Sequence, residues 1–277
     1  RASELLPALS QKGINVQYSE DVEGVLNADN LTKLDALILY ANIDNITDAQ
    51  ATALLNFVRD GGGFIPLHCA SYCFRNNEEI VALMGAQFQR HGAGTFSVSP
   101  TSDGESHPLL DGYRSFESWD ETYVHEKHGT DRTILQERDG EPWTWIRTQG
   151  RGRVFYTASG HDHRVWDQPH FHDLLKRAVY WSVGDDARAK LAALKIPAFE
   201  MMEVQLPGYI TRKLITEIPK PFPPEESLKL AQVPPGFELA LFASEPDIIN
   251  PIYIAWDERG RAFVVETIDY PNNLQAG

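Results

Sequence analysis

The sequence predicts an α/β fold: a doubly wound, mostly parallel sheet with helices on both faces, then a Pro-rich linker and a short β tail. Three observations lead to this prediction. Helical and strand-like patterns alternate along the first half of the chain, which is typical of a parallel sheet. The apolar runs at 35–40, 63–67 and 153–158 are continuous rather than alternating, as in buried parallel strands. After about residue 187 the chain becomes rich in proline.

Local signals mark where the elements begin and end. Thr47-Asp48-Ala49-Gln50 is a capping box, so a helix begins there, and Gly61 ends it. Pro169 suits the first position of the closing helix, which runs to Gly184. In order, the expected elements are a helix at 2–12, strands at 14–18 and 34–40, a helix from 47, a strand at 63–67, a helix at 78–84, strands at 95–99 and 133–137, a hairpin of 143–147 and 153–158, and a helix from 169.

Length and composition predict one large domain with a smaller piece behind it. The 277 residues are 42 % hydrophobic, which is enough for a proper core. We expect an α/β domain at 1–186, a linker at 187–232 around the prolines of 219–224, and a fragment at 233–277. The prolines exclude a helix interior or a central strand. The fragment, with strands at 237–243 and 262–266 and a turn at 257–260, is too short to close a barrel or propeller.

Charge and cysteine content narrow the choice of partners. A net charge of −14 argues against nucleic acid and anionic membranes, because both need clustered Lys and Arg. The chain contains no run of about 18 apolar residues, so we expect no membrane span. Cys69 and Cys73 do not decide the compartment and form no CxxC zinc pattern. We expect both to be small buried hydrophobes, and the partner to be a small molecule.

Two histidines stand where buried strands should end. His68 follows the run at 63–67, and His161 follows the run at 153–158. In an open α/β sheet, ligands bind outside the carboxyl ends of the strands. The two imidazoles are therefore expected to converge on one site, where the competing interpretation is a pair of core histidines bonded to backbone carbonyls.

Six stretches occur together in one order: GGGFIPLHCA at 61–70, LMGAQFQRH at 83–91, SHPLL at 106–110, FESWDETY at 116–123, GRGRVFYTASGHD at 150–162 and PHFHDLLKRAVYWSVG at 169–184. With these motifs the region from about 34 to 184 resembles the ThuA-like (trehalose-utilisation) family. The resemblance implies a flavodoxin-like fold of the class I glutamine amidotransferase-like type. It also implies carbohydrate chemistry.

The tail at 233–271 resembles the start of a second family, a membrane-bound dehydrogenase or sugar-dehydrogenase-like β-propeller. That resemblance implies a downstream propeller and a haem domain of the parent protein as partners. It also implies an extracytoplasmic location, periplasmic or secreted. The chain contains no CxxCH, so it holds no haem attachment site of its own.

The amidotransferase resemblance carries one departure. Those enzymes present a nucleophilic cysteine at the strand-to-helix elbow, where this chain has His68, with Cys69 one residue later. A one-residue offset at a tight turn redirects the side chain, so we expect no glutaminase activity. Where those enzymes place their catalytic histidine, this chain has His161.

Further candidates surround this pair. Of the adjacent Asp120 and Glu121, strand alternation lets at most one face the site as a general acid or base; the alternative is a solvated acidic loop. His125 and His128 are expected to be solvated in a polar loop. Neutral imidazoles beside carboxylates suit zinc or another divalent ion, with His68 and His161 as ligands, although the spacing is no recognised metal signature. Expected substrate-binding residues are His91, His107, Trp119, Tyr123, His163 and Trp166, with loop or turn capping as the alternative role of His91 and His107.

The resemblance implies action on oxidised (3-keto) glycosides or disaccharides. A histidine would serve as base, and a second histidine or a metal would polarise the carbonyl. The alternative, from a different class of protein, is a non-catalytic carbohydrate-binding or docking module of a larger dehydrogenase-like protein. Converging ionisable groups in a closed pocket favour the enzyme. An open, aromatic-lined groove without such groups favours the module.

Overall fold

The computed structural model describes residues 5–6, 8–9, 14–197, 200–207, 214–231, 233 and 237–267. Contacts divide the chain into two units, 1–194 and 195–277, and each is described by itself. Of the expected helix at 2–12, Leu5, Leu6, Ala8 and Leu9 are helical, and the rest lies outside the described residues.

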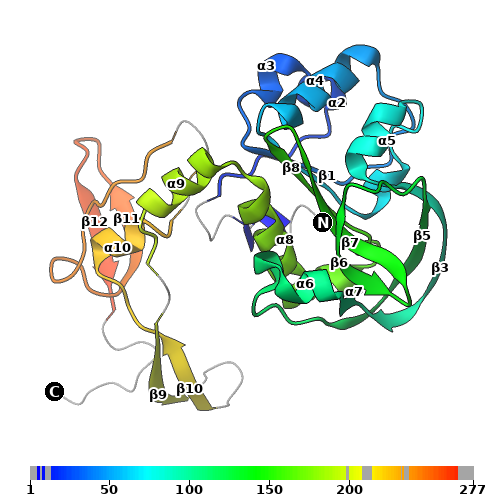
Figure 1. Ribbon diagram of the computed structural model, residues 1–277. Coiled ribbons are helices and arrows are strands. Elements are labelled where there is room, and N and C mark those ends of the chain that lie inside the picture. The colour runs from blue at the N-terminus through cyan, green and yellow to red at the C-terminus, as the bar shows by residue number, and fades with distance from the viewer. Residues whose placement is uncertain are drawn as a thin grey trace. The chain divides into compact units, whose positions relative to one another are not determined.

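The three apolar runs lie side by side in one six-stranded sheet (Figure 1). Strands β1 (Ala36–Leu39), β2 (Gly63–Pro66) and β8 (Gly152–Thr157) pair in parallel, which confirms the α/β prediction. The sheet is mixed, because its other half is antiparallel. There β8 pairs with β7 (Glu141–Gln149), β7 with β6 (Thr133–Arg138), and β6 with β4 (Ser99–Pro100). The predicted hairpin around Gly150 is the β7–β8 connection.

Helices cover both faces of this sheet, as a doubly wound fold requires. Phe64 and Val154 point to one face and pack against α4 (Asp48–Arg59) and α5 (Glu78–Met84). Ile65 and Phe155, their neighbours along the strands, point to the other face and pack against α8 (Pro169–Ser182). Further helices in the described part of this unit, beyond the helical residues at 5–9, are α2 (Val22–Val25), α3 (Ala28–Leu31), η1 (His68–Tyr72), α6 (Ser102–Ser106), η2 (Pro108–Leu110), α7 (His163–Trp166) and α9 (Asp185–Ala193).

A long antiparallel ribbon, β3 (Gln87–Ser97) with β5 (Glu117–Glu126), stands beside the main sheet (Figure 1). The sequence predicted only the end of β3 and, of β5, only strand-like alternation at Asp120 and Glu121. Conversely, residues 14–18 were expected to be a strand and lie in no strand, although Ile14 and Val16 pack against the core. Apolar and polar residues alternate in that segment, but no described strand pairs with it.

The second unit contains short elements. It has β9 (Met201–Pro207) paired with β10 (Leu214–Pro219), α10 (Pro224–Leu228), and β11 (Pro251–Trp256) paired with β12 (Ala262–Glu266). The expected linker at 187–232 thus contains a hairpin and a helix, and only 220–223 of the proline run lacks regular structure. The strand at 262–266 and the turn at 257–260 are confirmed, whereas 237–243 form no strand. No helix in the described part of the chain is long and apolar enough to cross a membrane.

The capping box at the start of α4 gives a first test of the fold. The Thr47 hydroxyl accepts from the Gln50 N–H, and the Gln50 side chain accepts from the Thr47 N–H. We expect Thr47→Ala to lower the free energy of unfolding by about 1 kcal/mol. Thr52→Ala, at an exposed position inside the same helix, should leave it unchanged or slightly raised. Urea unfolding of both variants checks this, and equal effects would contradict it.

Candidate active site

His68 is held at the turn between β2 and η1 in an unusual backbone conformation. Its φ is +47°, in the left-handed region that non-glycine residues seldom adopt. The side chain is 1 % exposed, and Nδ1 lies 2.7 Å from the carbonyl oxygen of Ala158 at the end of β8. Since a carbonyl only accepts, Nδ1 carries a hydrogen. Nε2 is therefore the nitrogen that the fold presents to other groups.

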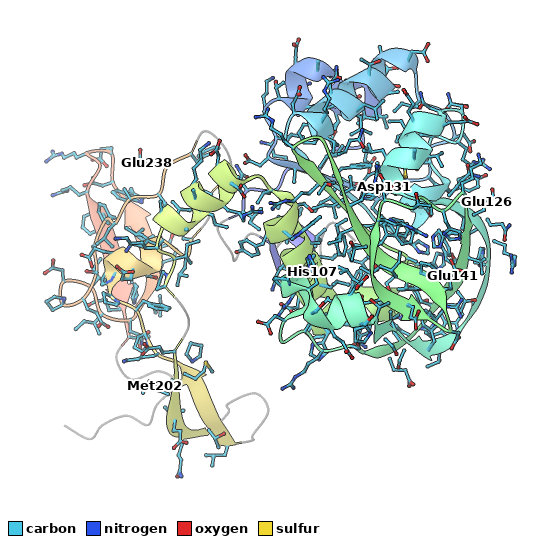
Figure 2. All side chains as sticks on the ribbon, viewed as in Figure 1. His107, Glu126, Asp131, Glu141, Met202 and Glu238 are labelled. Atoms are coloured by element: carbon cyan, nitrogen blue, oxygen red, sulfur yellow. The ribbon has the colours of Figure 1, made fainter. Side chains whose placement is uncertain are left out.

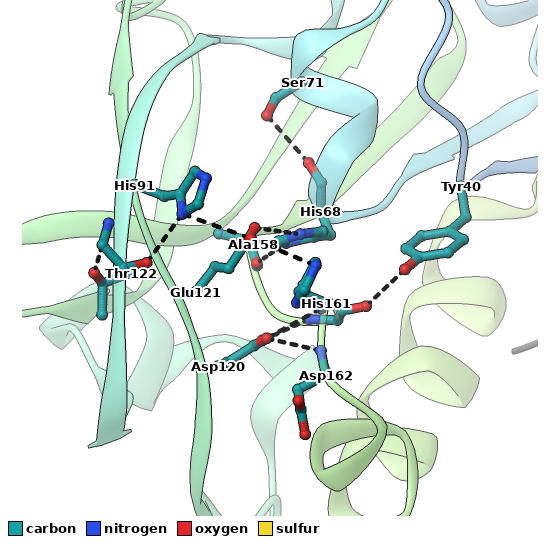
Figure 3. Close-up of polar contacts among 12 residues, drawn as sticks. Tyr40, His68, Ser71, His91, Asp120, Glu121, Thr122, Ala158, His161 and Asp162 are labelled. Atoms are coloured by element: carbon teal, nitrogen blue, oxygen red, sulfur yellow. Dashed lines mark hydrogen bonds and ion pairs between the residues drawn. The ribbon is translucent and has the colours of Figure 1, made fainter.

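A carboxylate stands at the centre of the site. His68 Nε2 lies 3.3 Å from one oxygen of Glu121, and His161 Nε2 lies 3.4 Å from the other (Figure 3). Nδ1 of His91 lies 3.6 Å from that second oxygen. We call these four residues the Glu121 cluster. They come from the turn after β2, from β3, from β5 and from the loop after β8, so the predicted convergence of His68 and His161 is found, and His91 joins them.

The four side chains of this cluster differ in their exposure to solvent. The side chains of His91 and His161 are 44 % and 51 % exposed, whereas Glu121 is 14 % exposed and His68 only 1 %. Two imidazoles therefore meet solvent, and the third is enclosed behind the carboxylate. The cluster thus sets one partly buried carboxylate beside two accessible rings.

Asp120 points the other way, as strand alternation predicts. It is 1 % exposed, and its two oxygens accept the backbone N–H groups of Gly160, His161 and Asp162 at 2.9–3.1 Å. Gly160 has φ +132°, which suits a residue without Cβ. Its carbonyl accepts from Tyr40 Oη and from Trp166 Nε1. Asp120 therefore fixes the loop that carries His161 and does not face the cluster itself.

The expected substrate-binding residues are divided by the fold. Tyr123 lies against the His68 ring, with ring centroids 4.2 Å apart, and burial raises the pKa of its hydroxyl. Trp119 is half-buried, with the Arg164 guanidinium 4.4 Å from its ring centroid. His163 is exposed beside Asp162. Tyr123 and Trp119 lie on β5, and His163 begins α7.

Two expected ligand contacts are not brought to the cluster. Trp166 is 1 % exposed and packs against Phe171, so its ring belongs to the core rather than to a sugar platform. His107, labelled in Figure 2, caps η2, where its Nδ1 accepts from the Leu109 N–H, and burial lowers its pKa.

The thiol at the elbow is poorly suited to nucleophilic chemistry. Burial raises the pKa of Cys69 to about 11 and that of Cys73 to about 12. The thiolate is the nucleophilic form, so neither residue is activated at neutral pH. The expectation that the chain is no glutaminase stays a prediction.

His125 was expected to be solvated and is buried. It lies on β5 at 4 % exposure, and it bonds Glu141 through Nδ1 and Tyr156 through Nε2, each at 3.0 Å. The missed signal is a period of two: Glu121, Tyr123 and His125 alternate along one strand and share a face. A segment taken as a loop gave no reason to look for that period.

Metal binding by His68 and His161 stays a prediction. Across the described residues no group of three or more His, Cys, Asp or Glu side chains is placed to hold an ion. His68 Nε2 is nevertheless buried without a well-aligned hydrogen bond, and its Nδ1–H is anchored to a carbonyl, as is usual for metal-binding histidines.

Lowering the pH should reduce the stability that Glu121 contributes to the folded protein. The polar contact with His68, against the opposing effect of burial and with help from the charges of His161 and His91, holds the pKa of Glu121 below its usual 4.5. A group whose folded pKa is depressed contributes stability above its unfolded pKa and loses it as pH falls through the folded value. We expect the free energy of unfolding to fall more steeply below pH 4.5 in wild type than in Glu121→Gln. Parallel urea-unfolding curves over this range would contradict it.

Two family models match parts of the chain. The ThuA family, described as trehalose utilisation, matches residues 2–182, and a domain of unknown function, DUF7133, matches residues 223–277. An α/β domain with a histidine-rich edge is thus the class of protein that fold and site define. The chain belongs to the ThuA family, and its fold is of the glutamine amidotransferase-like type.

Solved structures share this fold at low identity. A ThuA-like protein from Parabacteroides merdae is 16 % identical with a TM-score of 0.52, covering 65 % of this chain and 83 % of that one. A ThuA-like protein from Bacteroides uniformis is 20 % identical with a TM-score of 0.50, over 59 % and 74 %. A cytoplasmic protein from Salmonella typhimurium is 16 % identical with a TM-score of 0.51, over 66 % and 87 %. No curated protein matches the chain. The propeller assignment of the tail and the extracytoplasmic location stay predictions.

Proposed function

We propose that the domain acts on oxidised sugars, 3-keto glycosides or disaccharides, by acid–base chemistry at the Glu121 cluster. One observation carries the proposal: three imidazole nitrogens from separate parts of the chain lie within 3.6 Å of one carboxylate. The family description, trehalose utilisation, gives the carbohydrate context.

The chemistry of a 3-keto glycoside suits such a cluster. The ketone acidifies the C–H bond at C2, so a base can remove that proton. The electron pair then forms a C1–C2 double bond, the C1–O bond breaks with its electrons on the leaving oxygen, and that oxygen takes a proton from an acid. One base and one acid are needed on the accessible side. His161 and His91 fill these roles, and Glu121 orients both rings.

Glu121 and His68, the other two residues of the cluster, support the two accessible rings. Glu121 stays ionised because its pKa is held low, so it stabilises a neighbouring imidazolium rather than serving as the strong base. His68, enclosed and anchored to Ala158, fixes the carboxylate oxygen that His161 and His91 do not face. The arrangement resembles the logic of catalytic systems in which a carboxylate orients a histidine that moves protons.

Turnover of p-nitrophenyl 3-keto-β-glucoside tests the proposal, with the unoxidised glucoside as substrate control. We expect His161→Ala to lower the rate of p-nitrophenolate release by about 10²- to 10⁴-fold. His170→Ala, at a half-buried position of α8 outside the Glu121 cluster, should leave it unchanged. The same assay with a chelator added, and then with zinc added back, tests whether His68 and His161 bind a metal. Binding of the keto-glycoside without turnover in wild type would favour the docking module instead, and no binding would contradict both functions.

A further inference from the structure

A buried polar chain runs from β7 to the backbone of His68. Glu141 on β7 accepts from His125, and the far nitrogen of that ring lies 3.0 Å from the Tyr156 hydroxyl. Tyr156 Oη lies 2.9 Å from both Ser71 Oγ and the His68 carbonyl oxygen. Ser71 Oγ donates to the same carbonyl at 3.1 Å (Figure 3). Nothing in the acid–base mechanism uses this chain.

The carbonyl at its end belongs to the one strained residue of the cluster. Left-handed backbone at a non-glycine residue costs about 1 kcal/mol or more and persists only where surrounding contacts enforce it. His68 has φ +47°, and two buried hydroxyls converge on its carbonyl oxygen. Because the ring is fixed relative to this backbone, a change of φ would carry Nε2 away from Glu121.

The protons in the chain can all be placed. Burial keeps the Tyr156 hydroxyl protonated by raising its pKa, and it lowers the pKa of His125. For Glu141, burial is outweighed by the hydrogen bonds from His125, so its pKa lies below the usual value. A neutral His125 then donates from Nδ1 to Glu141 and leaves Nε2 as an acceptor. Ser71 donates its hydroxyl hydrogen to the His68 carbonyl, and the Tyr156 hydroxyl hydrogen is shared between that carbonyl and Nε2 of His125.

We propose that Tyr156 and Ser71 are positioning residues for His68, whose carbonyl their hydroxyls hold in the conformation that aims its ring at Glu121. His125 and Glu141 orient the Tyr156 hydroxyl from the far side. The effect on turnover rests on the proposed function, whereas the effect on the His68 ring does not.

NMR of the histidine rings in Tyr156→Phe and Ser71→Ala tests the proposal, with the His68 signal assigned from His68→Gln. Thr144→Val is the matched control, because it also removes a fully buried hydroxyl that bonds another hydroxyl, Thr157, without touching His68. We expect the His68 ¹H and ¹⁵N ring signals to move in Tyr156→Phe and Ser71→Ala and to stay in Thr144→Val at a similar loss of Tm. Keto-glycoside turnover should fall roughly tenfold to 10²-fold in kcat, with KM little changed.

The outcomes separate the two proposals. An unmoved His68 signal in a folded Tyr156→Phe or Ser71→Ala variant would overturn the positioning role, whatever the activity. A moved signal in a protein whose wild type neither binds nor turns over the keto-glycoside would support positioning and contradict the proposed function. If Tyr156→Phe fails to fold, Ser71→Ala alone decides, because Ser71 donates directly to the carbonyl.

Discussion

Glu121→Gln should lower keto-glycoside turnover by about 10²- to 10⁴-fold while the protein stays folded. The amide keeps the shape of the carboxylate but removes the charge that faces three imidazoles. His161 and His91 would then lose both their orientation and the stabilisation of their protonated forms. Steady-state release of p-nitrophenolate, with Tm as the folding check, measures this.

Glu117→Gln is the matched control for that experiment. Glu117 lies on the same strand, β5, but its side chain is exposed at the strand's beginning. It should retain wild-type turnover. A Glu121→Gln variant within a few-fold of wild type would mean that the carboxylate is only structural.

Asp120→Ala should produce the largest loss of stability, about 3 kcal/mol or more in the free energy of unfolding. The buried carboxylate accepts three backbone N–H groups at 160–162, and alanine would leave all three without it. Because the same loop carries His161, turnover should fall as well. Urea unfolding measures the first effect.

An exposed aspartate nearby provides the comparison. Asp167→Ala, at the end of α7, should change the free energy of unfolding by no more than about 0.5 kcal/mol. If Asp120→Ala is equally mild, the loop after β8 is held by something other than Asp120. The account of how His161 is placed would then be wrong.

The sequence predicted the cluster well where strand ends decide it. His68 and His161 follow strands that lie next to each other, since Leu67 and Thr157 pair in a parallel bridge. Parallel neighbours deliver their last residues to one edge, so the convergence follows from the order of the strands. The division between Asp120 and Glu121 likewise follows from alternation along one strand.

What could not be predicted depends on pairing between distant segments. The β3–β5 ribbon joins residues 87–97 to 117–126, and only that pairing turns His125 inward and Trp119 beside Arg164. The left-handed backbone of His68 is also set by contacts with Tyr156, 88 residues away in the chain. Local patterns carry no information on such contacts.

Hydrogen–deuterium exchange at C2 of a 3-keto glucoside is the most direct test of the central claim, that the Glu121 cluster moves a proton on an oxidised sugar. The glycoside is incubated with the protein in D₂O, and its C2–H signal is followed by NMR against the rate in buffer alone. We predict faster loss of that signal with wild type and with Glu117→Gln, and the buffer rate with Glu121→Gln and His161→Ala. Exchange at the buffer rate in the presence of wild-type protein that binds the sugar would contradict the claim.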